Sequence, residues 1–372
     1  MYNWQYKEWA NFTYDKKLIS EQTLDFMANI EATDTLFQGL SADEQQEEII
    51  RSMISEAVKT SEIEGEYISR NDLMSSIKNK LGINKIPENV RNRRAVATAN
   101  LLVSVRNANM DRLTEAQIKQ WHQILFENSG TVKAGKYRTG ETPMQIVSGA
   151  IGRETVHYEA PPSYRTAAEM KQFVKWYNSF IIKDKIDILI KTSVAHLYFE
   201  SIHPFEDGNG RIGRAIAEKC IAQSLGKSVI LSLSSVIEKN RSDYYNALKK
   251  AQSTLEITEW IVYFAQVIAE AQIQAADMVK FTLQKATFFD KFGKQINQRE
   301  LKALEKMFEA GIEGFQGGMT ASKYMNINRI SKATATRDLQ HLSEIGSLTE
   351  QSGGRSVHYL LNLPDSEMTD KL

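Results

Sequence analysis

The chain has 372 residues, a length that suits two or three domains. Its 46 Lys and Arg residues balance 46 Asp and Glu residues, so no overall charge excess would attract a polyanion or a membrane surface. The single cysteine, Cys220, excludes an intramolecular disulfide and a thiolate metal cluster. No signal-peptide pattern opens the sequence, and no apolar run approaches the roughly 18 residues of a membrane span. These features predict a cytoplasmic protein without a membrane segment.

Helical signals dominate the first three quarters of the chain. Ser41 and Glu44 form a capping box ahead of apolar residues at helical spacing, and Gly65 supplies a stop, so a helix is expected over 41–64. Strand signals are few, but two β-prone runs around a glycine-containing turn predict an exposed hairpin over 145–162. Further helices are expected over 90–106, 114–127, 166–181, 185–201, 210–224, 241–252 and 258–290.

A different pattern follows the long helix. From near Asn297 the sequence predicts three short helices and a two-stranded ribbon with a Gly-Gly turn, which is the outline of a winged helix-turn-helix. Between Lys323 and Arg355, five cations stand against three acidic residues, and this surplus is weak for tight DNA binding. DNA binding, homodimerisation and docking of a target protein therefore stay open as uses of this part.

The stretch HPFEDGNGRIGR, residues 203–214, combines features of an anion-binding loop. A run of turn-forming residues leads into a helix that starts near Gly210, so the first free amides of that helix point into the loop. Glycine at 208 and 210 lets the backbone approach a phosphate, and Asn209 can adopt a left-handed conformation while its side chain donates. Arg211 and Arg214 can reach the same side. A di- or triphosphate is the expected ligand.

Three ionisable side chains flank this loop. Asp207 would repel phosphate unless a cation lay between them, and Mg²⁺ bound by one carboxylate plus phosphates is the usual solution. Glu206 is interpreted as a solvated or helix-pairing carboxylate. His203 can take a proton near neutral pH, and a hydroxyl attacking phosphorus would need such a base. A lone histidine at a helix end or a lone Gly-Asn-Gly turn is more often structural, but their combination indicates a functional site.

The combined stretch resembles the Fic family signature HxFx(D/E)GNGRxxR, which it matches at every specified position from His203 to Arg214. The resemblance covers roughly residues 90–270. It implies an all-α fold, in which a Fic helical core carries a β-hairpin flap, an N-terminal helical extension and the C-terminal winged helix-turn-helix. It also implies transfer of AMP from ATP, with Mg²⁺, to a Ser, Thr or Tyr hydroxyl of a protein target or of the chain itself. The expected domains are 1–90, 91–290 and 291–372.

The resemblance implies roles for individual residues. His203 would be the general base and Asp207 the Mg²⁺ ligand, while Phe205 would anchor the loop in the core. The hairpin at 145–160 would be the flap that docks an extended target segment by strand pairing, although an edge hairpin without a partner is the alternative. The expected nucleotide-binding residues are Gly208, Asn209, Gly210, Arg211, Gly213, Arg214 and, on a helix that would close the nucleoside pocket, Asn240, Tyr244 and Tyr245, although paired tyrosines are as often core residues.

TSEIEG, residues 60–65, resembles the family's inhibitory motif (S/T)xxxE(G/N). Thr60 and Glu64 are one helical turn apart and share a face. If Glu64 pairs with Arg214, that arginine is not available to the γ-phosphate, and ATP would bind without its α-phosphate in line. An ordinary solvated glutamate is the alternative. In some relatives the same glutamate aligns a water that removes AMP, so removal of AMP is also open.

Two further functions remain as alternatives. One is a DNA-binding regulator whose Fic core senses a nucleotide without transferring it. The other is transfer of a different phosphate-linked group, because the motif binds a diphosphate more than it binds a base.

Overall fold

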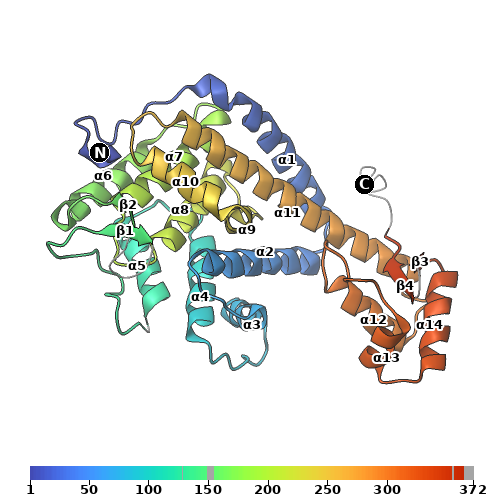
Figure 1. Cartoon of the computed structure of the whole chain (residues 1–372). Helices are drawn as coiled ribbons and strands as arrows, with labels where there is room; N and C mark the ends of the chain where they lie inside the picture. The colour runs from blue at the N-terminus through green and yellow to red at the C-terminus, as the bar shows by residue number, and fades with distance from the viewer. Residues whose placement is uncertain (128, 149–154, 354–355, 364–372) are drawn as a thin grey trace. The chain divides into compact units, whose positions relative to one another are not determined.

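The computed structural model describes residues 1–127, 129–148, 155–353 and 356–363, and Figure 1 follows their helices and strands along the chain. Short 3-10 helices cover Asn3–Gln5, Lys16–Ile19 and Ser163–Arg165. Strands β1 (Gln145–Ser148) and β2 (Thr155–Glu159) form one antiparallel pair, and β3 (Leu348–Gly353) and β4 (Ser356–Leu361) form another. The helices are α1 (Ser20–Gln38), α2 (Ala42–Ile63), α3 (Arg70–Lys80), α4 (Arg93–Asn107), α5 (Glu115–Phe126), α6 (Thr166–Ser179), α7 (Ile186–Ile202), α8 (Asn209–Leu225), α9 (Leu233–Lys239), α10 (Arg241–Ala251), α11 (Thr258–Phe292), α12 (Gln298–Phe308), α13 (Ala321–Asn328) and α14 (Lys332–Glu344).

Every helix expected from the sequence is present, with bounds that agree to within one turn. Three helices were not predicted: α1, α3 and α9. Of α3, only Leu73, Ser76 and Ile77 are buried, too few apolar positions for a clear helical period. Among the described residues, none of the helices combines the length and the apolar character needed to cross a membrane.

The chain divides into two compact units. The first comprises residues 1–32 and 49–275, and the second comprises 33–48 and 276–372. This division differs from the expected domains, because residues of the expected N-terminal region belong to both units and 276–290 group with the C-terminal part. The reason is that α1, α2 and α11 each contribute residues to both units, so the boundaries fall inside helices rather than in linkers.

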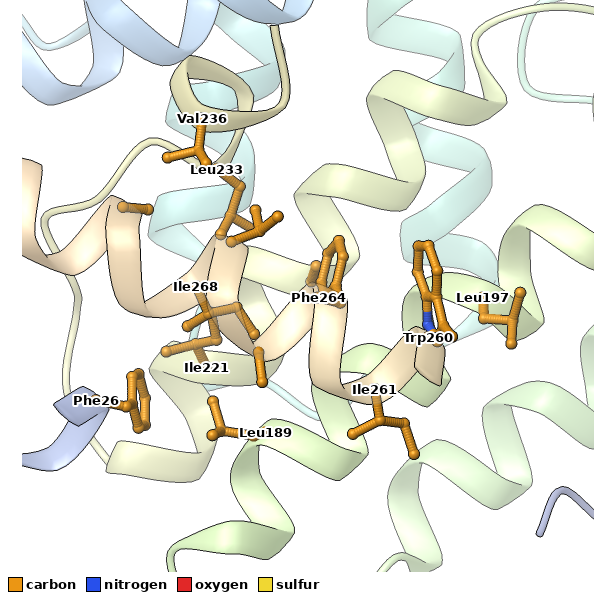
Figure 2. Packing of buried hydrophobic residues seen from close by; sticks show 14 of the residues in the cluster. Phe26, Leu189, Leu197, Ile221, Leu233, Val236, Trp260, Ile261, Phe264 and Ile268 are labelled. Atoms are coloured by element: carbon orange, nitrogen blue, oxygen red, sulfur yellow. The ribbon is translucent and has the colours of Figure 1, made fainter. Parts of the chain in front are cut away.

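Helix α7 is the centre of the first unit. Every residue from Asp187 to Ile202 is buried, which is the pattern of a helix surrounded by other elements. Its most extensive packing is against α8, where Cys220 is a buried free thiol. Figure 2 shows part of the apolar cluster around this pair, with Leu189 and Leu197 from α7, Ile221 from α8, and Trp260, Ile261, Phe264 and Ile268 from α11.

The second unit has its own core. Asn297 and Glu300 form the capping box that starts α12, and α12, α13, α14 and the β3–β4 ribbon follow in the predicted order. Asp338 of α14 ties the helices together, because it accepts hydrogen bonds from Arg299 at 2.9 Å and from the hydroxyl of Tyr324 at 3.0 Å. The predicted Gly-Gly turn includes position 354, which lies outside the described residues.

Candidate active site

The loop between α7 and α8 depends on two residues in the left-handed backbone region. His203 ends α7 with φ 49° and ψ 60°, and Gly208 precedes α8 with φ 78°. A side chain at 208 is excluded, because a Cβ there would lie 2.5 Å from the ring of Phe126. Phe205 is fully buried and stacks on His122 with ring centroids 3.9 Å apart. These contacts pack the start of α8 against α5, and they agree with an anchoring role for Phe205.

Asn209 stabilises the loop with its side chain and not through a left-handed backbone. It is the first residue of α8, and its Oδ1 accepts a hydrogen bond from the Phe205 N–H at 2.9 Å. Its Nδ2 donates to the Phe205 carbonyl, also at 2.9 Å. The left-handed conformation expected at Asn209 is therefore wrong; Gly208 adopts it, because glycine has no Cβ to clash. The amides at the start of α8 face the loop as donors for an anion.

A pocket of about 810 Å³ lies over this loop, a volume within the range of small-molecule sites. Its walls come from the α7–α8 loop, β1, β2 and α10, and from Glu64. Tyr244 is buried with its hydroxyl 2.8 Å from His196 Nε2, whereas Tyr245 is 41% exposed, and both line the pocket. Asn240, also expected to bind nucleotide, is exposed before α10 and is not among the lining residues.

His203 is in the neutral form that a general base needs. Its side chain is 12% exposed, and burial together with the nearby charge of Arg138 lowers the pKa of His203 to about 4. Arg138 also donates from Nε to the His203 carbonyl at 2.7 Å. Because the imidazole lines the pocket and is uncharged at neutral pH, it is free to accept a proton there.

Arg214 is bound by the segment 60–65. Its Nη2 donates to Glu64 Oε1 at 2.7 Å, and its Nε donates to Thr60 Oγ1 at 2.9 Å. Burial alone would raise the pKa of Glu64, but the charge and hydrogen bond of Arg214 bring the pKa of Glu64 below its ordinary value. Likewise, burial would lower the pKa of Arg214, and Glu64 raises it instead. The pair is ionic at neutral pH, and the expected contact between Glu64 and Arg214 is present.

Arg211 is bound by a second carboxylate that sequence reasoning missed. Arg211 Nη1 donates to Glu66 Oε2 at 3.1 Å, and Arg94 Nη1 lies 3.7 Å from the other oxygen of Glu66. The Arg211 guanidinium also lies over the Phe126 ring, 5.3 Å from its centroid. The only signal in the sequence was the position of Glu66 two residues after Glu64. Both arginines of the motif are therefore paired with carboxylates from the segment that follows α2.

Asp207 is placed where a metal ion could bind. Its side chain is 56% exposed, and its Oδ1 accepts a hydrogen bond from the Gly208 N–H. In the ranges that the structure describes, no three His, Cys, Asp or Glu side chains converge on a metal position. The same Oδ1 lies 3.8 Å from Arg211 Nη2. A partly exposed carboxylate beside an anion-binding loop fits Mg²⁺, which is commonly bound by one or two carboxylates plus phosphates and water. Neighbouring Glu206 is 34% exposed and lies 3.7 Å from Lys133, which agrees with a solvated carboxylate.

Gly213 lies between helices and not in the pocket. A Cβ at this position would collide with Glu200 Oε1 and would lie 3.2 Å from His196 Cε1. Gly213 is not among the lining residues, so the geometry gives it a packing role in place of the expected nucleotide contact. Glu200 does line the pocket, and sequence reasoning missed it.

The hairpin stands at the edge of the pocket. Ile146 pairs with Tyr158 and Val147 with Val156, with a register shift between Ile146 and Val147. Ile146 and Val147 line the pocket, and the Tyr158 hydroxyl donates to the Ser201 carbonyl at 2.7 Å, which ties the hairpin to α7. Of the expected flap over 145–160, residues 149–154 lie outside the described residues.

Comparison with known families identifies this constellation. Residues 112–221, which include the α7–α8 loop, match the model of the Fic/DOC family. The chain therefore contains a Fic domain. A second match covers residues 2–83 and is to a domain of unknown function, DUF4172. Glu64 lies in the DUF4172 match, while Tyr244 and Tyr245 lie beyond the end of the matched Fic domain.

Relatives of the Fic domain include proteins with named activities. The chain is 28% identical to protein adenylyltransferase fic-1 of Caenorhabditis elegans over 164 residues. This matched stretch is 44% of the chain. It spans only 27% or 28% of the length of the curated relatives it matches. The fold is similar to a Fic family protein from Desulfovibrio desulfuricans G20, with a TM-score of 0.58 and 19% identity over 94% of this chain and 97% of that chain. A Fic domain containing signaling protein from Bacteroides thetaiotaomicron matches with a TM-score of 0.53 and 19% identity, over 69% of this chain and 97% of its own.

Proposed function

We propose that this protein is an adenylyltransferase that transfers AMP from ATP to a Ser, Thr or Tyr hydroxyl of a protein target or of itself. The observation that carries the proposal is the neutral, pocket-facing His203 beside the free amides at the start of α8, in a pocket large enough for a nucleotide. A proton acceptor and an anion site in one pocket suit attack of a hydroxyl on a phosphate.

Different residues of the loop have different roles in this reaction: phosphate binding, Mg²⁺ binding and proton transfer. The amides at Gly208, Asn209 and Gly210, with Arg211, bind the α- and β-phosphates, and the Gly208 amide exchanges its present acceptor, Asp207 Oδ1, for phosphate. Asp207 would hold Mg²⁺, which neutralises phosphate charge when it is bound. His203 accepts the proton of the attacking hydroxyl, and its low pKa keeps it unprotonated at neutral pH.

In this proposal Glu64 inhibits transfer. Arg214 is the partner for the γ-phosphate, and Thr60 and Glu64 already accept hydrogen bonds from its Nε and Nη2. An ATP that lacks this contact binds with its α-phosphate out of line with the incoming hydroxyl. Removal of AMP by a water that Glu64 aligns is a further activity of the same site under this proposal.

The protein target docks on the hairpin at 145–160 in this proposal. Support comes from Ile146 and Val147, which line the pocket, and from the exposure of Val147 and Val156, which are 47% and 41% exposed. An extended segment that pairs with β1 would bring its hydroxyl toward His203.

For the second unit we propose a winged helix-turn-helix, supported by the order α12, α13, α14, β3 and β4. DNA contact, homodimerisation and target docking are its alternative uses, which mobility-shift and sedimentation measurements separate.

A cytoplasmic location fits the single buried thiol of Cys220.

The test is incubation of the full chain and of a cell lysate with ATP labelled at the α-phosphate, with and without Mg²⁺. We expect covalent label on the chain or on a partner, and label only weakly or not at all with His203→Ala, whose ATP affinity stays within a few-fold of wild type. A nucleotide-sensing regulator would bind ATP and leave no covalent label. Label that depends on another position of the nucleotide would indicate transfer of a different phosphate-linked group.

A further inference from the structure

The carboxyl group of Glu200 is a close neighbour of the imidazole of His203, the proposed general base. Glu200 is on α7, one helical turn before His203, and its Oε2 lies 3.9 Å from His203 Nδ1. Within the described residues, the buried Glu200 Oε1 makes no hydrogen bond. The buried His203 Nδ1 has no well-formed hydrogen bond either, and the backbone carbonyl of Glu200 is the polar group that acts on its ring beside the carboxyl group. Burial of a carboxyl oxygen without a hydrogen-bond partner lowers the stability of the fold. Such an oxygen therefore calls for a function, or for a second state of the protein in which it is paired.

The surrounding helices fix this carboxyl group in place. Glu200 is 4% exposed, and its Oε1 lies where a side chain at Gly213 would be, so α8 accommodates it only because position 213 is glycine. The ionisable groups that face Glu200 are His196 and His203 on its own helix, Arg214 on α8, Glu64 beyond α2, and Tyr244 and Tyr245 on α10.

We propose that Glu200 is a positioning residue for His203, whose carboxylate stabilises the imidazolium that forms when His203 Nε2 accepts the hydroxyl proton. This inference rests on the proposed function. In the step itself, the hydroxyl oxygen forms a bond to the α-phosphorus and the bond from that phosphorus to the bridging oxygen breaks. Pyrophosphate leaves with the electron pair, and the hydroxyl proton resides on His203 Nε2. The positive charge of the imidazolium then lies 3.9 Å from Glu200 Oε2, measured from Nδ1.

Charge supports this arrangement. Burial raises the pKa of Glu200 to about 8, against the nearby charge of Arg214, and Glu64 raises it further. Withdrawal of Glu64 therefore removes one negative neighbour and favours the ionised form of Glu200, in which it can assist His203.

The kinetic test uses the full chain in the wild-type and Glu64→Gly backgrounds. Single-turnover transfer is measured from pH 6 to 9.5 with saturating ATP and Mg²⁺, with binding of ATP measured separately. We expect the rate to rise as Glu200 ionises, and Glu200→Gln to lower the rate by about tenfold and remove this rise, with ATP affinity changed less than twofold. Glu200→Asp, which keeps the charge, should retain the rise.

Glu218→Gln is the matched control. Burial also raises the pKa of Glu218 to about 8, but this α8 residue interacts with Glu56 and Arg106 and does not line the pocket. Its replacement should leave the rate and its pH profile unchanged. Equal pH profiles for Glu200→Gln and its parent would overturn the proposal.

A second readout does not need transfer. The ring resonances of His203, assigned with His203→Ala, should shift in NMR spectra with an inflection near the pKa of Glu200, and Glu200→Gln should abolish that inflection while Glu218→Gln keeps it. An inflection that survives Glu200→Gln overturns the inference even if the protein transfers nothing. Absence of label in every variant, with the inflection present and lost as expected, would instead reject the transferase function and leave the contact standing.

Discussion

Arg214 is the residue at which inhibition and catalysis compete in the proposed function. Its side chain is 2% exposed, and its Nε and Nη2 already donate to Thr60 and Glu64, so a phosphate that binds Nη2 competes with the Glu64 carboxylate. A charge-assisted hydrogen bond contributes about 1.5–3 kcal/mol, which corresponds to a factor of ten or more in an equilibrium constant. Under the proposed function, the Glu64 side chain alone would be enough to change the transfer rate by this factor.

Glu64→Gly should accelerate automodification at least tenfold, because Arg214 becomes available to the γ-phosphate and the α-phosphate can turn into line. The measurement is the initial rate of labelling with saturating ATP and Mg²⁺. The double variant Glu64→Gly, Arg214→Ala should lose the gain, since the released arginine is absent. A single variant that labels no faster than wild type would mean that the pair between Glu64 and Arg214 does not limit transfer.

Glu66→Gln should tighten ATP binding by about three- to tenfold, because Arg211 loses its carboxylate partner at 3.1 Å. A partly exposed ion pair of this kind contributes about 1 kcal/mol. Isothermal titration calorimetry measures the affinity. Glu62→Gln is the matched control, since Glu62 pairs with Lys59 at 2.7 Å and not with an arginine of the loop. An affinity equal to that of the control would mean that the Glu66 contact does not compete with nucleotide.

At the scale of elements, the packing of α7 against α8 depends on the absence of a side chain at Gly213. Gly213→Ala would bring a methyl group into collision with Glu200 Oε1 and close to His196. Overpacking of a core usually costs about 1–3 kcal/mol, and we expect a loss of that size in urea-induced unfolding. Gly130→Ala is the control, because a Cβ at Gly130 would have nothing within 4 Å. Equal stability of the two variants would show that the helices separate without cost.

At the scale of the whole molecule, buried ionisable groups make stability depend on pH. Burial lowers the pKa of His122 and of His203 to about 4, and of His196 to about 3. These histidines stabilise the fold above pH 6.5, and the stability is lost as the pH falls toward 4, because the unfolded chain binds more protons. Glu200 and Glu218, with pKa values raised by burial to about 8, stabilise the fold below their unfolded pKa and lose that contribution as the pH rises through 8.

We therefore expect thermal stability to be greatest near pH 6.5 and to fall on both sides. Differential scanning calorimetry at pH 5, 6.5 and 8.5 measures it. Glu218→Gln should reduce the alkaline decline and steepen the acid one, because the wild-type carboxyl group loses its stabilising contribution over the whole interval from its unfolded pKa to about 8. An alkaline decline as steep as in wild type would mean that Glu218 does not titrate in this range.

Local patterns in the sequence determined much of this protein. The capping box at Ser41, the apolar spacing of the helices and the turn residues at 207–210 predicted the helices and the loop, because such signals involve residues only a few positions apart. The stretch from His203 to Arg214, together with TSEIEG, was enough to predict the phosphate loop and the contact between Glu64 and Arg214. Their roles in catalysis stay predictions.

The tertiary structure decided what depends on residues far apart in the chain. Glu200 precedes His203 by one turn, but only packing against Gly213 shows it buried with an unused oxygen. The pairing of Glu66 with Arg211 joins positions 145 residues apart. The division of α1, α2 and α11 between two units also follows from contacts along the whole chain. Burial, ion pairing and pKa depend on which distant segments surround a side chain, and a periodic pattern along one segment does not contain that information.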